Sequence, residues 1–203
     1  MEGKTLQFII DHEGEDVTRF ILSPAKYPGV EIPLAARCIE ARKKIKGKIP
    51  AFYAEPSLLY PDTLALEQCS SQASAEYKSR LIPEGATVAD LTGGLGVDSY
   101  FLSRRASKLT YYERKPHLAE AAQENFRTLG AMNIDCHTAE LTLEEIQGPD
   151  FPSYDIIFLD PARRDKMGGR VYSIADCEPN LALWRTPLLA KANTILAKVS
   201  PMA

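Results

Sequence analysis

The chain has 203 residues, of which 45% are hydrophobic and 25% charged, and its formal net charge is −3. This composition is that of a globular domain, and the negative charge argues against a protein that coats nucleic acid non-specifically. The sequence shows no signal-peptide pattern and no apolar run of the roughly 20 residues that cross a bilayer. We therefore expect a soluble, cytoplasmic protein.

Cysteine usage argues against a metal centre and against a disulfide framework. The sequence contains no C-x-x-C pair, and only one cysteine has a histidine beside it, so the spacing of zinc ligands is missing. The four cysteines are Cys38, Cys69, Cys136 and Cys177. We expect four reduced thiols.

The first part of the chain is rich in helical patterns and in prolines. Apolar residues at helical spacing predict amphipathic helices over 33–46 and 62–81. Between them, residues 49–61 contain three prolines and three aromatic residues, which favour an extended segment packed on a surface. Docking and a contact with substrate are both open for this segment. We expect a helical N-terminal region over 1–61 and a second unit over 62–203.

From residue 87 onward, short apolar runs alternate with helical patterns, which predicts an α/β fold with a Rossmann-like, doubly wound and mostly parallel sheet. The expected strands cover 87–92, 108–113, 134–139, 154–160 and 194–200. The expected helices cover 97–105, 116–130 and 179–191, with a short turn near 142–147. Because crossovers are right-handed, the topological switch lies beside the first strand, and we expect ligands to bind there.

A glycine-rich turn follows the first strand. The run Asp90-Leu-Thr-Gly-Gly-Leu-Gly96 leads directly into the helix expected over 97–105. Its three glycines permit tight backbone turns and let a ligand approach the main chain, while the helix offers unpaired N–H groups. Taken alone, this loop is equally consistent with a site for a nucleotide-like ligand and with a simple tight turn.

Acidic residues stand where two further strands end. Glu113 follows Asp90 by 23 positions, and a carboxylate about 20 residues beyond such a loop accepts hydrogen bonds from ribose hydroxyls. Asp160 ends the fourth strand, whose unbroken Ile-Ile-Phe-Leu run is typical of a strand buried on both faces. The alternatives are an exposed strand-end carboxylate at Glu113 and a rigid turn with a helix cap around Asp160 and Pro161.

The D-x-T-G-G-x-G loop, the strand-end Glu113 and the D-P-A-R loop together resemble class I S-adenosylmethionine-dependent methyltransferases. The resemblance covers about residues 60–201. More narrowly, the segments 67–71, 159–165 and 168–170 are similar to those of bacterial methyltransferase-like proteins. Those proteins carry a THUMP-like domain after the catalytic core, and we expect these 203 residues to lack it.

The resemblance implies S-adenosylmethionine as the cofactor, no metal, and a set of site residues. The cofactor-binding residues that it implies are Asp90, Thr92, Gly93, Gly94, Gly96, Asp98, Glu113, Ala139 and Glu140. In this arrangement the glycine loop faces the methionine portion, Glu113 holds the ribose, and Ala139 with Glu140 frames the adenine. The catalytic residues that it implies are Asp160, Pro161 and Arg163, in the loop that receives the methyl acceptor.

The D-P-A-R loop departs from the D-P-P-Y pattern that orients a base amine through an aspartate and a proline carbonyl. Ala162 and Arg163 replace the second proline and the aromatic residue, so methylation of a base amine does not follow. Covalent chemistry on uracil is not expected either, because the run Lys198-Val-Ser-Pro201 supplies no cysteine after the fifth strand.

The chain ends directly after the fifth expected strand, where the sheet of this family adds two more strands. We therefore expect a truncated fold that is a fragment of a longer protein, with a naturally shortened sheet as the alternative. An uncovered fifth strand would be open to dimer pairing along its edge.

RNA is the expected methyl acceptor, with protein and small molecules left open. Basic residues in and after the D-P-A-R loop offer contacts to an RNA backbone, and they are Arg163, Arg164, Lys166 and Arg170. The basic run over 42–48 offers further contacts to an RNA backbone, although a solvated helix face explains this run equally well. One alternative to a methyltransferase is a catalytically inactive cofactor-binding or assembly module. Another, less favoured because the loop reads G-G-x-G, is a nucleotide-dependent oxidoreductase.

Overall fold

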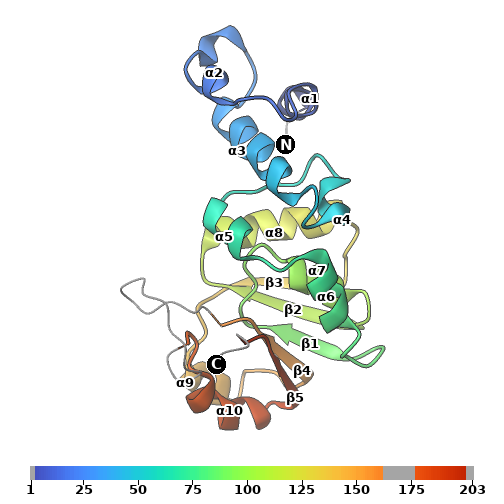
Figure 1. The fold of residues 1–203 in the computed structure, drawn as a ribbon. Coiled ribbons are helices and arrows are strands. Elements are labelled where there is room, and N and C mark those ends of the chain that lie inside the picture. Colours follow the sequence, from blue (N-terminus) through green and yellow to red (C-terminus); the bar gives the residue numbers. More distant parts are fainter. Residues whose placement is uncertain (1–2, 162–176, 200–203) are drawn as a thin grey trace.

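The first part of the chain is helical, and α1, α2 and much of α3 project away from the sheet (Figure 1). The structure is a computed structural model that describes residues 3–161 and 177–199. The elements of the first part are α1 (Gly3–Asp11), α2 (Thr18–Ile21), the 3-10 helix η1 (Pro24–Lys26), α3 (Ile32–Ile45), α4 (Pro50–Tyr53), α5 (Thr63–Gln68) and α6 (Gln72–Ser79).

Two expectations for this part need correction. The single helix expected over 62–81 is wrong, because α5 ends at Gln68 and α6 begins only at Gln72. Cys69 and Ser71 have extended backbone, and the Ser71 hydroxyl caps α6 by accepting a hydrogen bond from the Ser74 N–H at 3.3 Å. The segment expected to be extended over 49–61 contains the short helix α4, which starts with a proline.

The second part of the chain forms a parallel sheet with the strand order β3-β2-β1-β4-β5. The strands are β1 (Thr87–Asp90), β2 (Lys108–Glu113), β3 (Ile134–Thr138), β4 (Tyr154–Leu159) and β5 (Ala192–Ala197). The predicted α/β, Rossmann-like fold is confirmed, and β5 begins before its expected start at 194. The chain crosses to the other side of β1 after β3, so the topological switch lies between β1 and β4.

Helices cover both faces of this sheet (Figure 1). Successive strand residues point to opposite faces, so Ile156 and Phe158 join the cluster around α7 and α8, whereas Ile157 and Leu159 join the one around α9 and α10. The helices of this part are α7 (Val97–Ser103), α8 (Pro116–Thr128), α9 (Leu143–Gln147) and α10 (Leu181–Leu189). Phe8 and Ile39 from the first part belong to the same cluster as Phe158, so the N-terminal helices share the core of the sheet.

Asn125 on α8 fixes the proline-rich segment to this core. Its side-chain oxygen accepts a hydrogen bond from the Leu59 N–H at 2.7 Å, and its amide donates one to the Leu59 carbonyl at 2.9 Å. Asn125 is 2% exposed, and an alanine in its place would leave both half-buried main-chain groups of Leu59 without this partner. The segment therefore docks on the sheet domain through its backbone.

Asn125→Ala is expected to lower the free energy of unfolding by about 1–3 kcal/mol, because it removes two hydrogen bonds that are each worth about 0.5–1.5 kcal/mol. Urea denaturation would measure the change. Thr128→Ala is the matched control on the same helix, since the exposed Thr128 hydroxyl donates to the carbonyl of Glu124 within that helix, and it should stay within about 0.5 kcal/mol of wild type. Equal losses in the two variants would contradict this role of Asn125.

Within the residues that the structure describes, no helix combines the length and the apolar character needed to cross a membrane.

Candidate functional site

Three predicted acidic residues lie at one edge of the sheet. Asp90 ends β1, Glu113 ends β2 and Asp160 directly follows β4. Because β1 pairs with β2 on one side and with β4 on the other, the parallel strands bring their carboxyl ends to the same edge. The glycine loop continues from β1 at this edge.

The three glycines of the loop are required for different reasons. A Cβ at Gly93 would stand 2.1 Å from the Tyr111 ring, and one at Gly96 would stand 2.4 Å from the Phe126 ring. Gly94 has a φ of +57°, and among the described residues a Cβ there would meet only the Thr92 carbonyl oxygen, at 3.9 Å. Packing thus explains Gly93 and Gly96, whereas Gly94 faces open space.

Glu113 holds the glycine loop through its carboxylate. One oxygen, Oε2, accepts a hydrogen bond from the Gly94 N–H at 2.8 Å, and Oε1 accepts one from the Lys115 N–H at 2.8 Å. The Tyr111 hydroxyl donates to the Gly94 carbonyl at 2.6 Å. The peptide groups on both sides of Gly94 are therefore fixed by β2 and its end, while each carboxylate oxygen keeps a further lone pair.

Asp90 lies beneath the loop and is only 1% exposed. Its carboxylate accepts hydrogen bonds from the Ser99 hydroxyl at 2.5 Å and from the Thr92 N–H at 3.0 Å. Burial raises the pKa of Asp90 to about 7, with smaller contributions from the nearby carboxylates of Asp98 and Asp160, while its hydrogen bonds oppose the rise. This side chain ties strand, loop and α7 together.

Asp160 is held at both its main chain and its side chain. Its N–H donates to the Thr92 hydroxyl at 2.7 Å, and the Lys198 ammonium donates to its Oδ2 at 2.5 Å. Burial raises the pKa of Asp160, and Lys198 opposes that rise. Pro161 follows and is buried, whereas the predicted Arg163 lies outside the described residues.

The sequence reading missed a buried ion pair between α6 and α7. The Lys78 ammonium lies 2.5 Å from Oδ1 of Asp98 and donates to the Ser70 hydroxyl at 2.8 Å. The Ser70 hydroxyl in turn donates to Oδ2 of Asp98 at 2.8 Å. Only Asp98 was a predicted site residue. The segment 67–71, which contains Ser70, is similar to that of bacterial methyltransferase-like proteins, but no signal in the sequence pointed to Lys78.

The predicted adenine residues lie beyond β3. Ala139 donates its N–H to the Glu113 carbonyl at 3.0 Å, which places it beside the end of β2. Glu140 is exposed and pairs with Arg114 at 3.2 Å, and Arg114 also reaches Glu178 at 3.1 Å. Ala139 therefore joins the strand-end site, and Glu140 stands on its rim.

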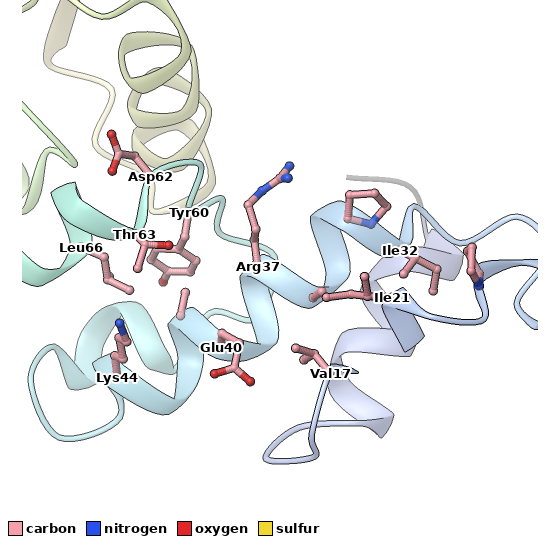
Figure 2. A pocket seen from close by; sticks show the side chains of 14 residues that line it. Val17, Ile21, Ile32, Arg37, Glu40, Lys44, Tyr60, Asp62, Thr63 and Leu66 are labelled. Atoms are coloured by element: carbon pink, nitrogen blue, oxygen red, sulfur yellow. The ribbon is translucent and has the colours of Figure 1, made fainter. Parts of the chain in front are cut away.

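A cavity of about 510 Å³ lies elsewhere, along α3 between α2 and α5 (Figure 2). Apolar side chains such as Val17, Ile21 and Leu66 line it, and Arg37 stands among the polar residues. None of the predicted site residues that the structure describes borders it. The described residues hold no group of three or more histidine, cysteine or acidic side chains arranged to bind a metal. The edge of the sheet at the carboxyl ends of the strands is thus the candidate site because of its polar groups, and not because a large cavity lies there.

The fold matches a solved structure over nearly the whole chain. A protein described as a "putative methyltransferase from Porphyromonas gingivalis W83" aligns with 98% of this chain at 37% sequence identity and a TM-score of 0.80. This chain has the class I methyltransferase fold. It spans about half of that longer protein, 48% of its length.

Other methyltransferase structures are less similar. One is a SAM-dependent methyltransferase from Agrobacterium tumefaciens, with 18% identity and a TM-score of 0.45 over 64% of this chain and 44% of that chain. Another is SMU.1697c, a "putative methyltransferase" from Streptococcus mutans in complex with SAH, with 15% identity and a TM-score of 0.43 over 60% of this chain and 65% of that one. No family model matches the chain, and no curated protein matches it.

Proposed function

We propose that this chain is an S-adenosylmethionine-dependent methyltransferase domain that binds its cofactor at the carboxyl edge of β1 and β2. The observation that carries the proposal is Gly94. Its backbone is fixed by Glu113 and Tyr111, its φ is positive, and among the described residues a Cβ there would meet only the Thr92 carbonyl oxygen, at 3.9 Å. A main chain held in this way offers a close approach to a nucleotide-like ligand.

The remaining cofactor contacts follow from the strand ends. We assign the methionine portion to the glycine loop, the ribose to the open lone pairs of Glu113, and the adenine to Ala139 and the rim at Glu140. Thr92, Asp90 and Asp98 belong to the same region, but their polar groups bond to the protein. Their proposed role is therefore to order the loop.

The bound cofactor supplies a methyl group on a sulfonium sulfur. Transfer of this group is an in-line displacement, so the protein chiefly has to hold the acceptor atom close and in line. Asp160 is the residue placed for this task, because it stands at the next strand end and a carboxylate accepts a hydrogen bond from an acceptor N–H or O–H. Pro161 stiffens the loop, and Arg163 is proposed to contact the acceptor.

RNA is the proposed acceptor class, and its support is the basic sequence over 163–170. The other basic run gives no support, because its members bind within the chain. Arg42 pairs with Glu13 at 2.6 Å, and Lys44 pairs with Glu67 at 2.6 Å. Lys48 donates to two main-chain carbonyls at 2.9 Å. This run stabilises the N-terminal helices.

Gly94→Ala is expected to weaken the binding of S-adenosylhomocysteine by about tenfold or more, because the added methyl group enters the space assigned to the ligand. Isothermal titration calorimetry measures this affinity. Gly130→Ala is the matched control, since Gly130 also has a positive φ, +73°, and open space beyond it. Both changes should cost about 1–2 kcal/mol in stability through backbone strain, yet only Gly94→Ala should lose affinity. Equal affinity of both variants for S-adenosylhomocysteine would overturn the assignment of the cofactor to the glycine loop.

Transfer is tested separately with S-adenosylmethionine that carries a labelled methyl group, offered with total RNA, with protein and with small molecules. Label in RNA that Asp160→Ala abolishes supports the proposed activity. Binding of S-adenosylhomocysteine without any transfer would instead identify a cofactor-binding module. Binding of a nicotinamide dinucleotide in its place would identify an oxidoreductase.

A further inference from the structure

Lys198 reaches the candidate site from the end of β5. Its N–H donates to the Leu159 carbonyl at 2.9 Å and so continues the pairing of β5 with β4. This bond places its side chain at the carboxyl edge of the sheet, where the ammonium lies 2.5 Å from Oδ2 of Asp160. The two side chains are 32% and 27% exposed, so the pair is largely shielded from water and screened less than a surface pair.

Asp160 is also fixed from the opposite side. Its N–H donates to the Thr92 hydroxyl, and the Thr92 N–H donates to Asp90. Hydrogen bonds therefore connect the ends of β1, β4 and β5 through four residues, and Lys198 is the one whose charge faces Asp160 directly. Such connected bonds hold a side chain in one orientation.

We propose that Lys198 is a positioning residue, which holds the carboxylate of Asp160 ionised and oriented so that it can accept a hydrogen bond from the methyl acceptor. This role rests on the proposed methyltransferase function. Without Lys198, burial would favour the neutral acid, and a protonated carboxyl group donates a hydrogen bond from one of its oxygens.

Several charged side chains affect the protonation state of Asp160, and they come from β1, α6, α7 and the end of β5. Asp98 on α7 raises its pKa, and Lys78 on α6 lowers it, but Lys198 is the largest of the opposing charges. Asp90 at the end of β1 interacts with Asp160 as well. Because Lys78 and Asp98 form a pair of their own at 2.5 Å, their effects on Asp160 largely cancel. Among the residues that the structure describes, the charge of Lys198 is therefore the main one that stabilises the carboxylate.

The test compares Lys198→Met and Lys198→Arg in the whole chain. Carbon-13 NMR of the aspartate carboxyl groups, with the Asp160 signal assigned by its loss in Asp160→Asn, measures the pKa of Asp160 directly. Lys198→Met should raise this pKa by about 1–3 units, which is the effect of removing an adjacent opposite charge, and Lys198→Arg should restore it. Lys108→Met is the control, since it removes an exposed ammonium that pairs with Asp135 at 3.3 Å, and it should leave the pKa unchanged.

The pH profile of methyl transfer gives the second readout. Its acid limb should move upward in Lys198→Met by the same amount as the pKa, and it should return in Lys198→Arg, whereas a merely structural role would lower the rate at every pH. An unchanged Asp160 pKa in Lys198→Met overturns this inference even when S-adenosylhomocysteine binds normally. A wild-type chain that neither binds S-adenosylhomocysteine nor transfers a methyl group overturns the proposed function and, with it, this role of Lys198.

Discussion

Lys78→Met is expected to lower the free energy of unfolding by about 3–5 kcal/mol, because it leaves the carboxylate of Asp98 buried without its counter-ion. The two side chains are only 7% and 10% exposed. The ammonium also donates to the Ser70 hydroxyl and lies 5.2 Å from the centre of the Phe158 ring. Because both side chains are buried between α6 and α7, most of the penalty should appear in the measured stability.

Urea denaturation measures this loss, and two further variants show its origin. Lys78→Met combined with Asp98→Leu removes both charges, and it should be less destabilised than Lys78→Met alone. Lys108→Met breaks an exposed pair whose side chains are 62% and 51% accessible, and it should cost less than about 1 kcal/mol. The buried-pair explanation fails if Lys78→Met costs no more than Lys108→Met, or if the double variant is the least stable of the three.

The stability of wild-type protein should fall as the pH rises from about 5 to 8, and Asp90 should account for much of the fall. Its pKa is about 7 in the folded protein, against an ordinary value of 3.8. The folded state therefore binds the proton more tightly than the unfolded state does. The stabilisation is complete below pH 3.8 and is lost as the pH rises through 7. At 1.36 kcal/mol per unit, the full shift corresponds to a ceiling of about 4 kcal/mol.

Asp90→Asn isolates this contribution, because the amide can still accept from Thr92 and can donate to Ser99. Unfolding free energies at pH 5 and pH 8 should differ less in Asp90→Asn than in wild type. Asp155→Asn is the control: hydrogen bonds from Thr87 lower the pKa of Asp155, so its contribution changes only in more acidic solution and the difference should match wild type. Identical differences in Asp90→Asn and wild type would show that Asp90 is not the group responsible.

The fold could be predicted wherever a pattern of neighbouring residues determines the local structure. The apolar run before Asp160 predicted β4, and the parallel arrangement followed from the alternation of strands and helices. The break between α5 and α6 was not predicted, because the apolar periodicity continues across it. The hydrogen bond from the Ser74 N–H to the Ser71 hydroxyl caps α6 and starts the new helix. Such a cap contributes little free energy, so the apolar pattern that runs across the break conceals it in the sequence.

The candidate site was predictable in part for the same reason. Parallel strands bring their carboxyl ends to one edge, so the strand order alone gathers Asp90, Glu113 and Asp160. The different roles of the three glycines could not be predicted from the sequence. Gly93 and Gly96 are required by the rings of Tyr111 and Phe126, and only the packed structure separates these two from Gly94.

The sequence by itself determined the α/β architecture, the glycine turn and the acidic residues at the strand ends, since each depends on neighbours along the chain. Only the tertiary structure decided which cations accompany the acidic residues of the site. Lys78 lies 20 positions from Asp98, and Lys198 lies 38 positions from Asp160. No local periodicity connects residues so far apart. Their pairing arises because burial makes an uncompensated charge costly, and the packing of α6 and β5 determines which ammonium groups are within reach.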